Sequence, residues 1–351
     1  MLRTLKFLLK RALSLFLTLV IAVYITILIA NAGGYVDEIM KSEIRMNIAI
    51  AVANNPAYSG LPASQLEKII ETQTQSAFKR LGLDKPFFIR SFYYLRDALT
   101  LDLGRAYYMT SDSGSRRVKL IILERLPQTI LLFTTATVLI FFINMMGGLY
   151  LSRRYGSKPD KLLLTLAPLS SIPGWFYLIL LILIFYTWLH VLPPGGLVDY
   201  PPPPDKLGYF LSVLKHMILP LSAWIISYTP IGIYSMRNFF LIFSTEDYVE
   251  VAKAKGLPSR QIEYKYILRP ALPPIITSFA LSVIASWTGA IITETVYGWP
   301  GLGYTIAVAI GLFDAPVIVG VTVMYAYLLV VTVFILDLVY GLIDPRIRVG
   351  G

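Results

Sequence analysis

Apolar runs with at most one Asp, Glu, Lys or Arg recur six times along the chain. They lie at 12–34, 126–152, from about 162 to 190, 216–236, from about 273 to 294, and 315–342, where Asp337 is the one charge. A bilayer needs about 20 consecutive apolar residues per helix, so each run can cross. The runs lack the alternation of apolar and polar residues that is typical of barrel strands. Because lipid offers the backbone no hydrogen-bond partners, a helix is the structure expected for each run. The pattern predicts an all-α polytopic membrane protein with six transmembrane helices.

The first run has an alternative interpretation as a cleaved signal. Lys6, Lys10 and Arg11 precede it, and Ala30-Asn31-Ala32 resembles a signal-peptidase site. The apolar core of a cleaved signal is usually about 7–15 residues long. This run is longer, which favours a retained membrane helix.

The positive charges alternate along the chain in a way that sets orientation. Lys and Arg gather in segments 3–11, 153–161, 237–269 and 346–348, whereas 191–214 and 297–314 hold only Lys206. Short cytosolic loops carry the excess of Lys and Arg. We therefore expect a multi-pass protein of the cell membrane with both termini cytosolic. The net charge of +10 is mostly orientation charge and indicates no nucleic-acid partner.

Composition removes several kinds of chemistry. The chain is 56% hydrophobic and 15% charged, and its mean hydropathy is +0.65. It has no Cys, which excludes disulfides and thiolate ligands, and only two His, so we expect no metal site. It also lacks the P-loop pattern of an ATP-binding chain.

Three regions follow from the pattern. Residues 1–34 form the N-terminal tail and first transmembrane helix, 35–119 an extracytoplasmic region, and 120–351 a five-helix core with a cytosolic loop at 237–272. In 35–119 we expect two amphipathic helices, the first with Ser64 as N-cap and Gly82 as its stop. This region either caps the outer ends of the spans or offers a docking surface to an external partner. The Pro-rich stretch 193–205 is expected to be extended.

The cytosolic loop contains a short polar helix with well-marked ends. Ser244 and Asp247 resemble a capping box, and acids fill the first turn. Gly256 stands where a left-handed residue ends a helix, and Pro258 prevents continuation. The stretch predicts a helix of about ten residues, roughly 15 Å long.

One face of this helix carries Tyr248, Val251, Ala252 and Lys255, by three-and-four spacing. The helix either anchors the loop at the membrane surface or serves as a rigid lever for a partner. The small residues Ala252, Ala254 and Gly256 favour close approach of another surface.

Seven motifs carry a resemblance to a known family. "EDYVEVAKAKGLPSRQIEYKYILRPALPP", which begins at Glu246, resembles the cytosolic signature loop of ATP-binding-cassette importer permeases. Glu250-Val251-Ala252 stands for its Glu-Ala-Ala, and Gly256 follows at the family's distance. The others are "LGLDKP" (81–86), "DLGRAY" (102–107), "ERLPQT" (124–129), "SIPGWF" (171–176), "ETVYGWPGLG" (294–303) and "LIDPRIR" (342–348). Together they resemble the first permease subunit of oligopeptide, dipeptide and nickel importers.

The resemblance implies a heterodimer with a second homologous permease, two cytosolic ATPase subunits and an extracytoplasmic substrate-binding protein. ATP and Mg would be bound by the ATPases, and this chain would couple hydrolysis to transport without being an enzyme. Peptides are the first substrate class it implies, oligosaccharides the second and nickel chelates the third. The implied ATPase-coupling residues are Tyr248, Glu250, Val251, Ala252, Lys253, Ala254, Lys255 and Gly256.

Two further sets of residues are candidates for the path itself. Polar or aromatic side chains within the spans could line it, namely Asn144, Ser282, Ser286, Trp287 and Thr288. An external gate could form after the fifth span from Glu294, Trp299, Gly301 and Gly303. Glu294 has a structural alternative, which is to accept backbone N–H groups of that turn. We expect Asp337 to pair with a basic residue of the tail, and Pro173, Pro220 and Pro230 to kink or break helices.

Two other classes of function compete with an importer. An intramembrane enzyme would need paired acids, a Ser/His pair or metal ligands within the spans, and His216 has no such neighbours in the sequence. A non-transporting structural subunit of a membrane complex is the other alternative.

Overall fold

The computed structural model describes the backbone of residues 2–31, 34–58 and 60–343, and their side chains except at 2–6, 35–36, 81, 284, 288 and 339–343. This part of the chain is helical and has no strand beyond one isolated bridge. The helices are α1 (Leu2–Asn31), α2 (Tyr35–Ala53), α3 (Ala63–Leu81), α4 (Phe87–Leu99), α5 (Val118–Ser152), α6 (Lys158–Leu166), α7 (Gly174–Ile182), α8 (Lys206–Ser244), α9 (Asp247–Ala254), α10 (Ser259–Gln261), α11 (Arg269–Ala285), α12 (Ile291–Tyr297), α13 (Leu302–Gly311) and α14 (Ala315–Ile343).

The described residues contain six candidate membrane crossings if one bent pair counts as a span. Five helices are long and apolar enough, at Phe7–Asn31, Val118–Ser152, Lys206–Ser244, Ser259–Val283 and Ala315–Leu338. The sixth joins Lys158–Ser171 to Gly174–Trp188 with a bend of 93°. The break falls at Pro173, as predicted, because proline removes a backbone donor and clashes with the preceding turn. By contrast, α8 continues through Pro220 and Pro230.

The fifth apolar run, 273–294, was wrongly predicted to be one helix. The crossing helix begins earlier, at Ser259, and α11 ends at Ala285. A 3-10 turn over 286–288 and Gly289, with φ of 67°, separate it from the short helix α12. The positive φ suits glycine, which has no Cβ to clash. The search for uncharged runs could not reveal this break, because no charged residue occurs in the run before Glu294.

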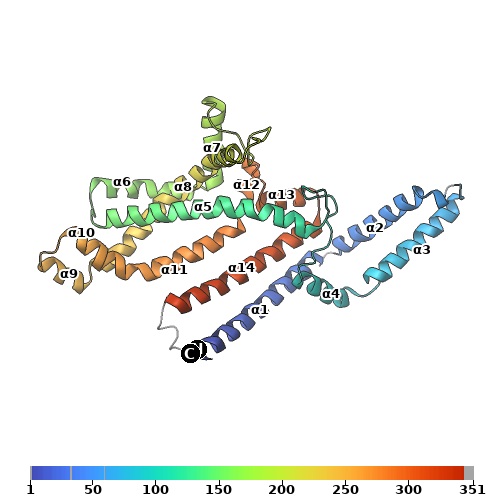
Figure 1. Ribbon diagram of the computed structural model, residues 1–351, viewed down its shortest axis with the longest axis horizontal. Helices are drawn as coiled ribbons and strands as arrows, with labels where there is room; N and C mark the ends of the chain where they lie inside the picture. The colour runs from blue at the N-terminus through green and yellow to red at the C-terminus, as the bar shows by residue number, and fades with distance from the viewer. Residues whose placement is uncertain (1, 32–33, 59, 344–351) are drawn as a thin grey trace. The chain divides into compact units, whose positions relative to one another are not determined.

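The described chain forms two compact units, residues 1–124 with 308–351, and residues 125–307. In the first unit α1 and α14 run side by side (Figure 1). Their contact buries Leu19, Val23 and Val323. Arg11 of α1 holds Asp337 of α14 at 2.5 Å. Asp337 therefore pairs with the first span, whereas the tail arginines expected as its partners lie outside the described residues.

The region limits 1–34, 35–119 and 120–351 stay predictions.

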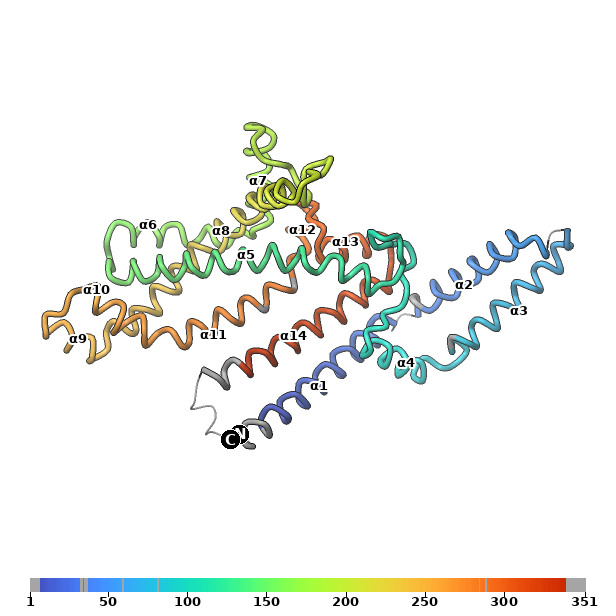
Figure 2. The backbone as a smooth tube through the Cα atoms, in the orientation of Figure 1, coloured from blue at the N-terminus to red at the C-terminus, as the bar shows by residue number. Residues whose placement is uncertain are grey.

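Helices α2 and α3 pack on each other as a hairpin (Figure 2). The predicted stop of α3 is confirmed, because Gly82 is left-handed with φ of 71°. Its predicted cap is wrong: Pro62 occupies the N-cap position, and Ser64 lies inside the first turn. The second amphipathic helix is present as α4, whereas α2 was not foreseen. Segment 193–205 is free of helix, as expected.

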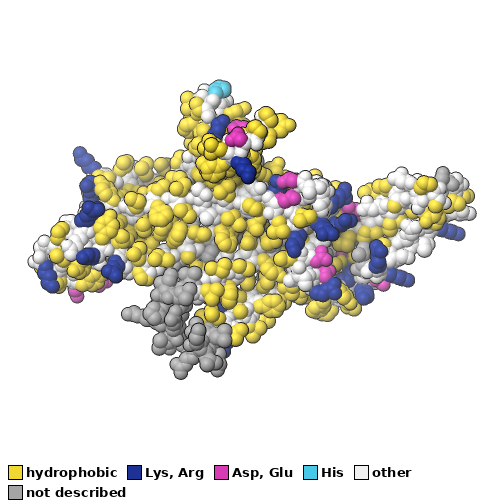
Figure 3. All heavy atoms as spheres, viewed as in Figure 1, with side chains coloured by type: hydrophobic (Ala, Val, Ile, Leu, Met, Phe, Trp, Pro, Cys, Tyr) yellow, Lys and Arg dark blue, Asp and Glu magenta, His cyan; other side chains and the backbone are white. Residues whose placement is uncertain are grey.

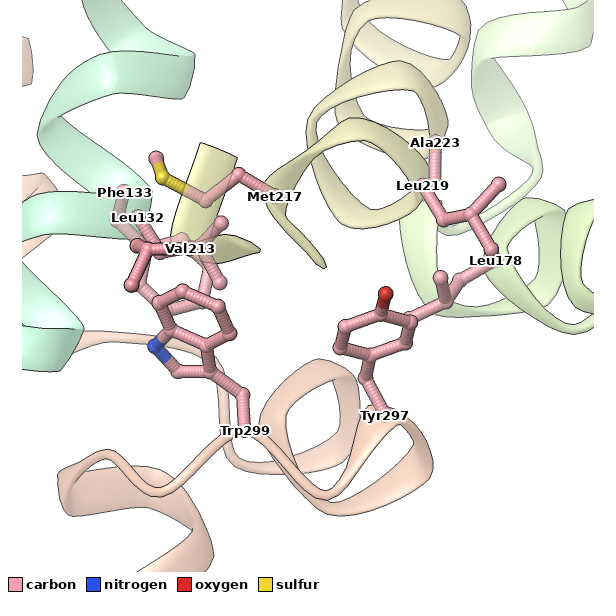
Figure 4. Close-up of a cluster of buried hydrophobic side chains, with 9 residues drawn as sticks. All are labelled: Leu132, Phe133, Leu178, Val213, Met217, Leu219, Ala223, Tyr297 and Trp299. Atoms are coloured by element: carbon pink, nitrogen blue, oxygen red, sulfur yellow. The ribbon is translucent and has the colours of Figure 1, made fainter. Parts of the chain in front are cut away.

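Among the described residues of the unit 125–307, two apolar cores position the helices. One gathers buried residues of α5, α7, α8 and the 297–299 turn (Figure 4). The other joins α5, α8, α9 and α11. Close contact between α5 and α8 requires Gly148, because a Cβ there would lie 2.8 Å from the backbone nitrogen of Arg237. The second core fixes α9 to the spanning helices, which no local signal in the sequence predicts.

Candidate functional site: the short helix and the cavity

Helix α9 occupies the predicted place and ends as predicted. The Gly256 N–H donates to Lys253 O at 2.9 Å and the Leu257 N–H to Ala252 O at 3.3 Å, with Gly256 left-handed at φ of 70°. The predicted capping box is wrong. Glu246 is the N-cap residue and makes no side-chain cap bond, while the Ser244 hydroxyl donates back to Leu241 O. Two backbone hydrogen bonds therefore close the C-terminal end of α9, whereas its start has no side-chain cap.

The two faces of α9 differ sharply. Val249 and Ala252 are 0% and 2% exposed and pack into the core with Phe240 and Ile267. Ala252 therefore holds the helix to its own unit and cannot be a contact surface for a partner. The sequence missed Val249, because only packing shows which face of so short a helix is buried.

The opposite face of α9 is free in the described structure. Tyr248 is 40% and Val251 52% exposed. Glu250 and Lys253 form an exposed pair at 3.7 Å, and Ala254 and Lys255 are exposed as well. Desolvation and then the Glu246 carboxylate raise the pKa of Tyr248, so its phenol stays neutral at physiological pH. The result is a rigid surface of one aromatic, one aliphatic and several charged groups.

Two ion pairs join elements at this end of the unit, one linking the end of α5 to the segment after α10 and the other linking α8 to α6. Arg153, just after α5, binds Glu263, which follows α10, at 2.8 Å. Arg237 of α8 donates to Asp160 of α6 through Nε at 2.9 Å and Nη2 at 2.7 Å, and Asp160 and Arg237 are both buried. In the sequence, both arginines indicate only orientation charge. Their partners lie far away in sequence, so no local signal could have identified them.

Positive charge gathers at this end of the unit. Figure 3 shows Lys and Arg side chains around α6, α9 and α10, with apolar surface along the helices beyond them. This is the charge distribution that short cytosolic loops have.

A cavity of about 570 Å³ lies among α5, α8 and α11. Asn144 and Ser282, two of the predicted path residues, line it together with Trp224, Tyr228 and Phe279. The Oδ1 atom of Asn144 has no hydrogen-bond partner among the described residues. Ser286 and Trp287 do not line the cavity, and the side chain of Thr288 lies outside the described part. The structure therefore gathers two of the five predicted residues.

The predicted gate segment is a tightly packed turn. The buried Glu294 carboxylate accepts the Thr129 hydroxyl at 2.8 Å and the Tyr304 N–H at 2.9 Å. A Cβ at Gly301 would lie 2.5 Å from Glu294 Oε2, and one at Gly303 2.9 Å.

Trp299 completes this turn. It is fully buried, and its indole faces Val213 and Leu132 (Figure 4).

Glu294 serves the structural role that was its alternative, because it accepts a backbone N–H at this turn. A gating role stays a prediction.

Among the described residues no group of three or more His, Asp or Glu side chains is placed to hold a metal ion. The described site thus consists of an exposed face on α9 and a cavity among α5, α8 and α11.

Comparisons with known proteins agree with this geometry. A family model described as "Binding-protein-dependent transport system inner membrane component" matches residues 144–349. The di/tripeptide transport system permease protein DppB of Pseudomonas aeruginosa is 31% identical over 300 residues, which cover 80% of this chain and 87% of that one. The dipeptide transport system permease protein DppB of Bacillus subtilis is 32% identical over 268 residues, 76% of this chain and 81% of that one.

One solved structure, of the MetNI methionine ABC transporter in an inward-facing conformation, is also similar. It shares 19% identity with a TM-score of 0.48 and covers 64% of this chain and 96% of that one. The family model and the relatives carry the assignment. The chain belongs to the family of binding-protein-dependent transport system inner membrane components: it is a permease subunit of ATP-binding-cassette importers and not an enzyme.

Proposed function

We propose that the chain forms part of the path by which an importer carries dipeptides or oligopeptides across the cell membrane. Support comes from relatives named as peptide permeases that align with more than three quarters of the chain. These names favour peptides over oligosaccharides. The cavity suits such a role, because Asn144 Oδ1, which has no partner among the described residues, can accept a peptide N–H, and the surrounding aromatic groups tolerate varied side chains.

The exposed face of α9 is the proposed docking site for a cytosolic ATPase subunit. Tyr248 and Val251 offer apolar contact, and Glu250, Lys253 and Lys255 offer charge around it. Two ATPase subunits would bind ATP and Mg. A second homologous permease and an extracytoplasmic substrate-binding protein would complete the importer. This places α9 and both termini in the cytosol.

The mechanism we propose is rigid-body transmission. Because Val249 and Ala252 are packed among residues of α5, α8 and α11, α9 cannot shift alone. The pairs Arg153–Glu263 and Arg237–Asp160 tie the same region to the ends of the helices. Closure of the ATPase pair on nucleotide would therefore move α9 together with the helices that line the cavity.

Single cysteines test the docking face, because the chain has no native Cys. We expect Val251→Cys to react with a maleimide in inside-out vesicles and to crosslink to the ATPase, since this side chain is exposed. Ala252→Cys should react at least about tenfold more slowly, because its side chain is buried. The measurements are the labelling rate in vesicles that carry the chain without its ATPase subunits and the crosslink yield in the assembled importer. Equal reactivity at both positions, or labelling of Val251→Cys from outside intact cells, would contradict the assignment.

Uptake tests the substrate class. Cells that lack this chain should lose uptake of labelled di- and oligopeptides by at least about tenfold, while uptake of an oligosaccharide stays unchanged. Restoring the chain should restore peptide uptake. The peptide assignment fails if uptake of an oligosaccharide, and not of peptides, depends on the chain.

A further inference from the structure

A second cavity, of about 540 Å³, lies within the unit formed by residues 1–124 and 308–351. One part of its wall is apolar and includes Met40 and Ile44 of α2 and Val319 of α14. Another part is polar and comes from α2, α4 and the loop before α5. Its volume is in the range of ligand pockets, about 300–1,000 Å³. It contains none of the residues assigned above to coupling or to the path.

Tyr107 is the strongest sign that this cavity binds a ligand. Its side chain is only 7% exposed, yet its hydroxyl has no hydrogen-bond partner among the described residues. A buried polar group without a partner costs stability, so native structures rarely keep one. Desolvation, and then the negative charge of Glu43, raise the pKa of Tyr107, so the hydroxyl keeps its proton and can donate.

The polar part of the lining carries both signs of charge. Arg116 lies 3.9 Å from Glu43, farther than a hydrogen bond, and its side chain is half exposed. Arg105 and Asp102 also line the cavity. A purely anionic or purely cationic ligand would meet groups of its own sign here. A zwitterion, with a phosphate and an ammonium group, finds a partner for each end.

The cavity lies at the boundary of the membrane-spanning segments. Asn31, the last residue of α1, and Ala315, the first of α14, both line it. Helix α4 packs on α1 through stacked rings of Phe92 and Tyr24 at 5.6 Å, and it exposes Phe88 and Ile89. Aromatic and apolar side chains exposed beside the end of a span are typical of the membrane interface.

We propose that this cavity binds one phospholipid with a zwitterionic head group, of the phosphatidylethanolamine type. An acyl chain would lie against Met40, Ile44 and Val319, the phosphate near Arg105 and Arg116, and the ammonium group near Glu43 and Asp102. The Tyr107 hydroxyl would donate to an oxygen of the phosphate or ester. The apolar wall favours a lipid over a free head group, because only the lipid has an acyl chain. The carboxylates favour a zwitterionic lipid over an anionic one, because only the zwitterion has an ammonium group. The bound lipid stabilises the unit, because it binds the folded form only.

The experiment uses the full chain in its assembled importer, delipidated and supplied with phosphatidylethanolamine, phosphatidylglycerol or free phosphoethanolamine. Native mass spectrometry measures the retained lipid. We expect one phosphatidylethanolamine per chain and about tenfold weaker retention of phosphatidylglycerol. Tyr107→Phe should weaken retention about fivefold, the effect of one hydrogen bond. Arg116→Gln should weaken it at least as much.

Neighbouring residues supply matched controls. Tyr108 is 58% exposed, and neither Tyr108 nor Arg117 lines the cavity, so Tyr108→Phe and Arg117→Gln should retain lipid like the parent chain. Without lipid, Tyr107→Phe should unfold at the same temperature as the parent or higher, because it removes an unpaired hydroxyl. The proposal is overturned if both members of each pair behave alike, if the two lipids are retained equally, or if free phosphoethanolamine raises the unfolding temperature as much as the lipid does.

Discussion

Replacing Asp160 with Ala should lower the free energy of unfolding by about 3–5 kcal/mol, because it leaves the buried Arg237 guanidinium without its counter-charge. The carboxylate accepts two bonds from Arg237 and a third from the Gly156 N–H at 2.8 Å. Both side chains are almost fully buried. The midpoint of unfolding in mixed detergent micelles measures the effect.

Two control variants separate this pair from charge in general. Glu250→Gln removes an acid from an exposed pair and should change stability little, because exposed pairs contribute little. A double change of Asp160→Leu and Arg237→Met should recover most of the loss, since it removes both charges together. If Asp160→Ala unfolds like the parent chain, the pair does not stabilise this unit.

Replacing Asp314 with Ala should free the loop before α5 and destabilise its unit by at least about 3 kcal/mol. The fully buried carboxylate accepts the N–H groups of Tyr107 at 3.0 Å, Tyr108 at 2.8 Å and Met109 at 3.0 Å. Each buried donor left without a partner costs about 1–3 kcal/mol. Trypsin should then cut at Arg116 or Arg117 at least about tenfold faster than in the parent chain.

The exposed Asp84 provides the control for this change. Asp84→Ala should leave both the trypsin rate and the unfolding midpoint unchanged, because its side chain lies at the surface. Asp314→Asn keeps one acceptor oxygen and should give an intermediate rate. A loop that resists trypsin in Asp314→Ala would show that other contacts hold it.

Helix α9 shows which features the local sequence can predict and which it cannot. Its C-terminal end could be predicted, because Gly256 adopts a left-handed conformation that few other residues tolerate. Which of its residues are buried could not be predicted. The three-and-four rule placed Ala252 and Val251 on one face, yet Ala252 is buried and Val251 exposed. The difference is a small rotation about the helix axis, which contacts with α8 and α11 decide.

The candidate path residues could likewise be predicted only in part from the sequence. Polar residues within apolar runs marked Asn144 and Ser282, which the structure brings to one cavity. Ser286 and Trp287 carried the same signal but lie beyond the end of α11, where the helix breaks. A polar residue in a span is therefore a weak guide to the path, since the sequence does not say where the helix stops.

The sequence by itself determined the membrane-helical class, the six crossings, the basic end of the spans and the glycine-ended helices. These depend on transfer of side chains into lipid and on the backbone freedom of single residues, both of which are local properties. Only the tertiary structure decided that Arg237 meets Asp160, that Arg11 meets Asp337 and that Tyr107 lines a cavity while its hydroxyl has no partner among the described residues. Such contacts join residues far apart in the chain, and they form only where packing of the helices brings those residues together.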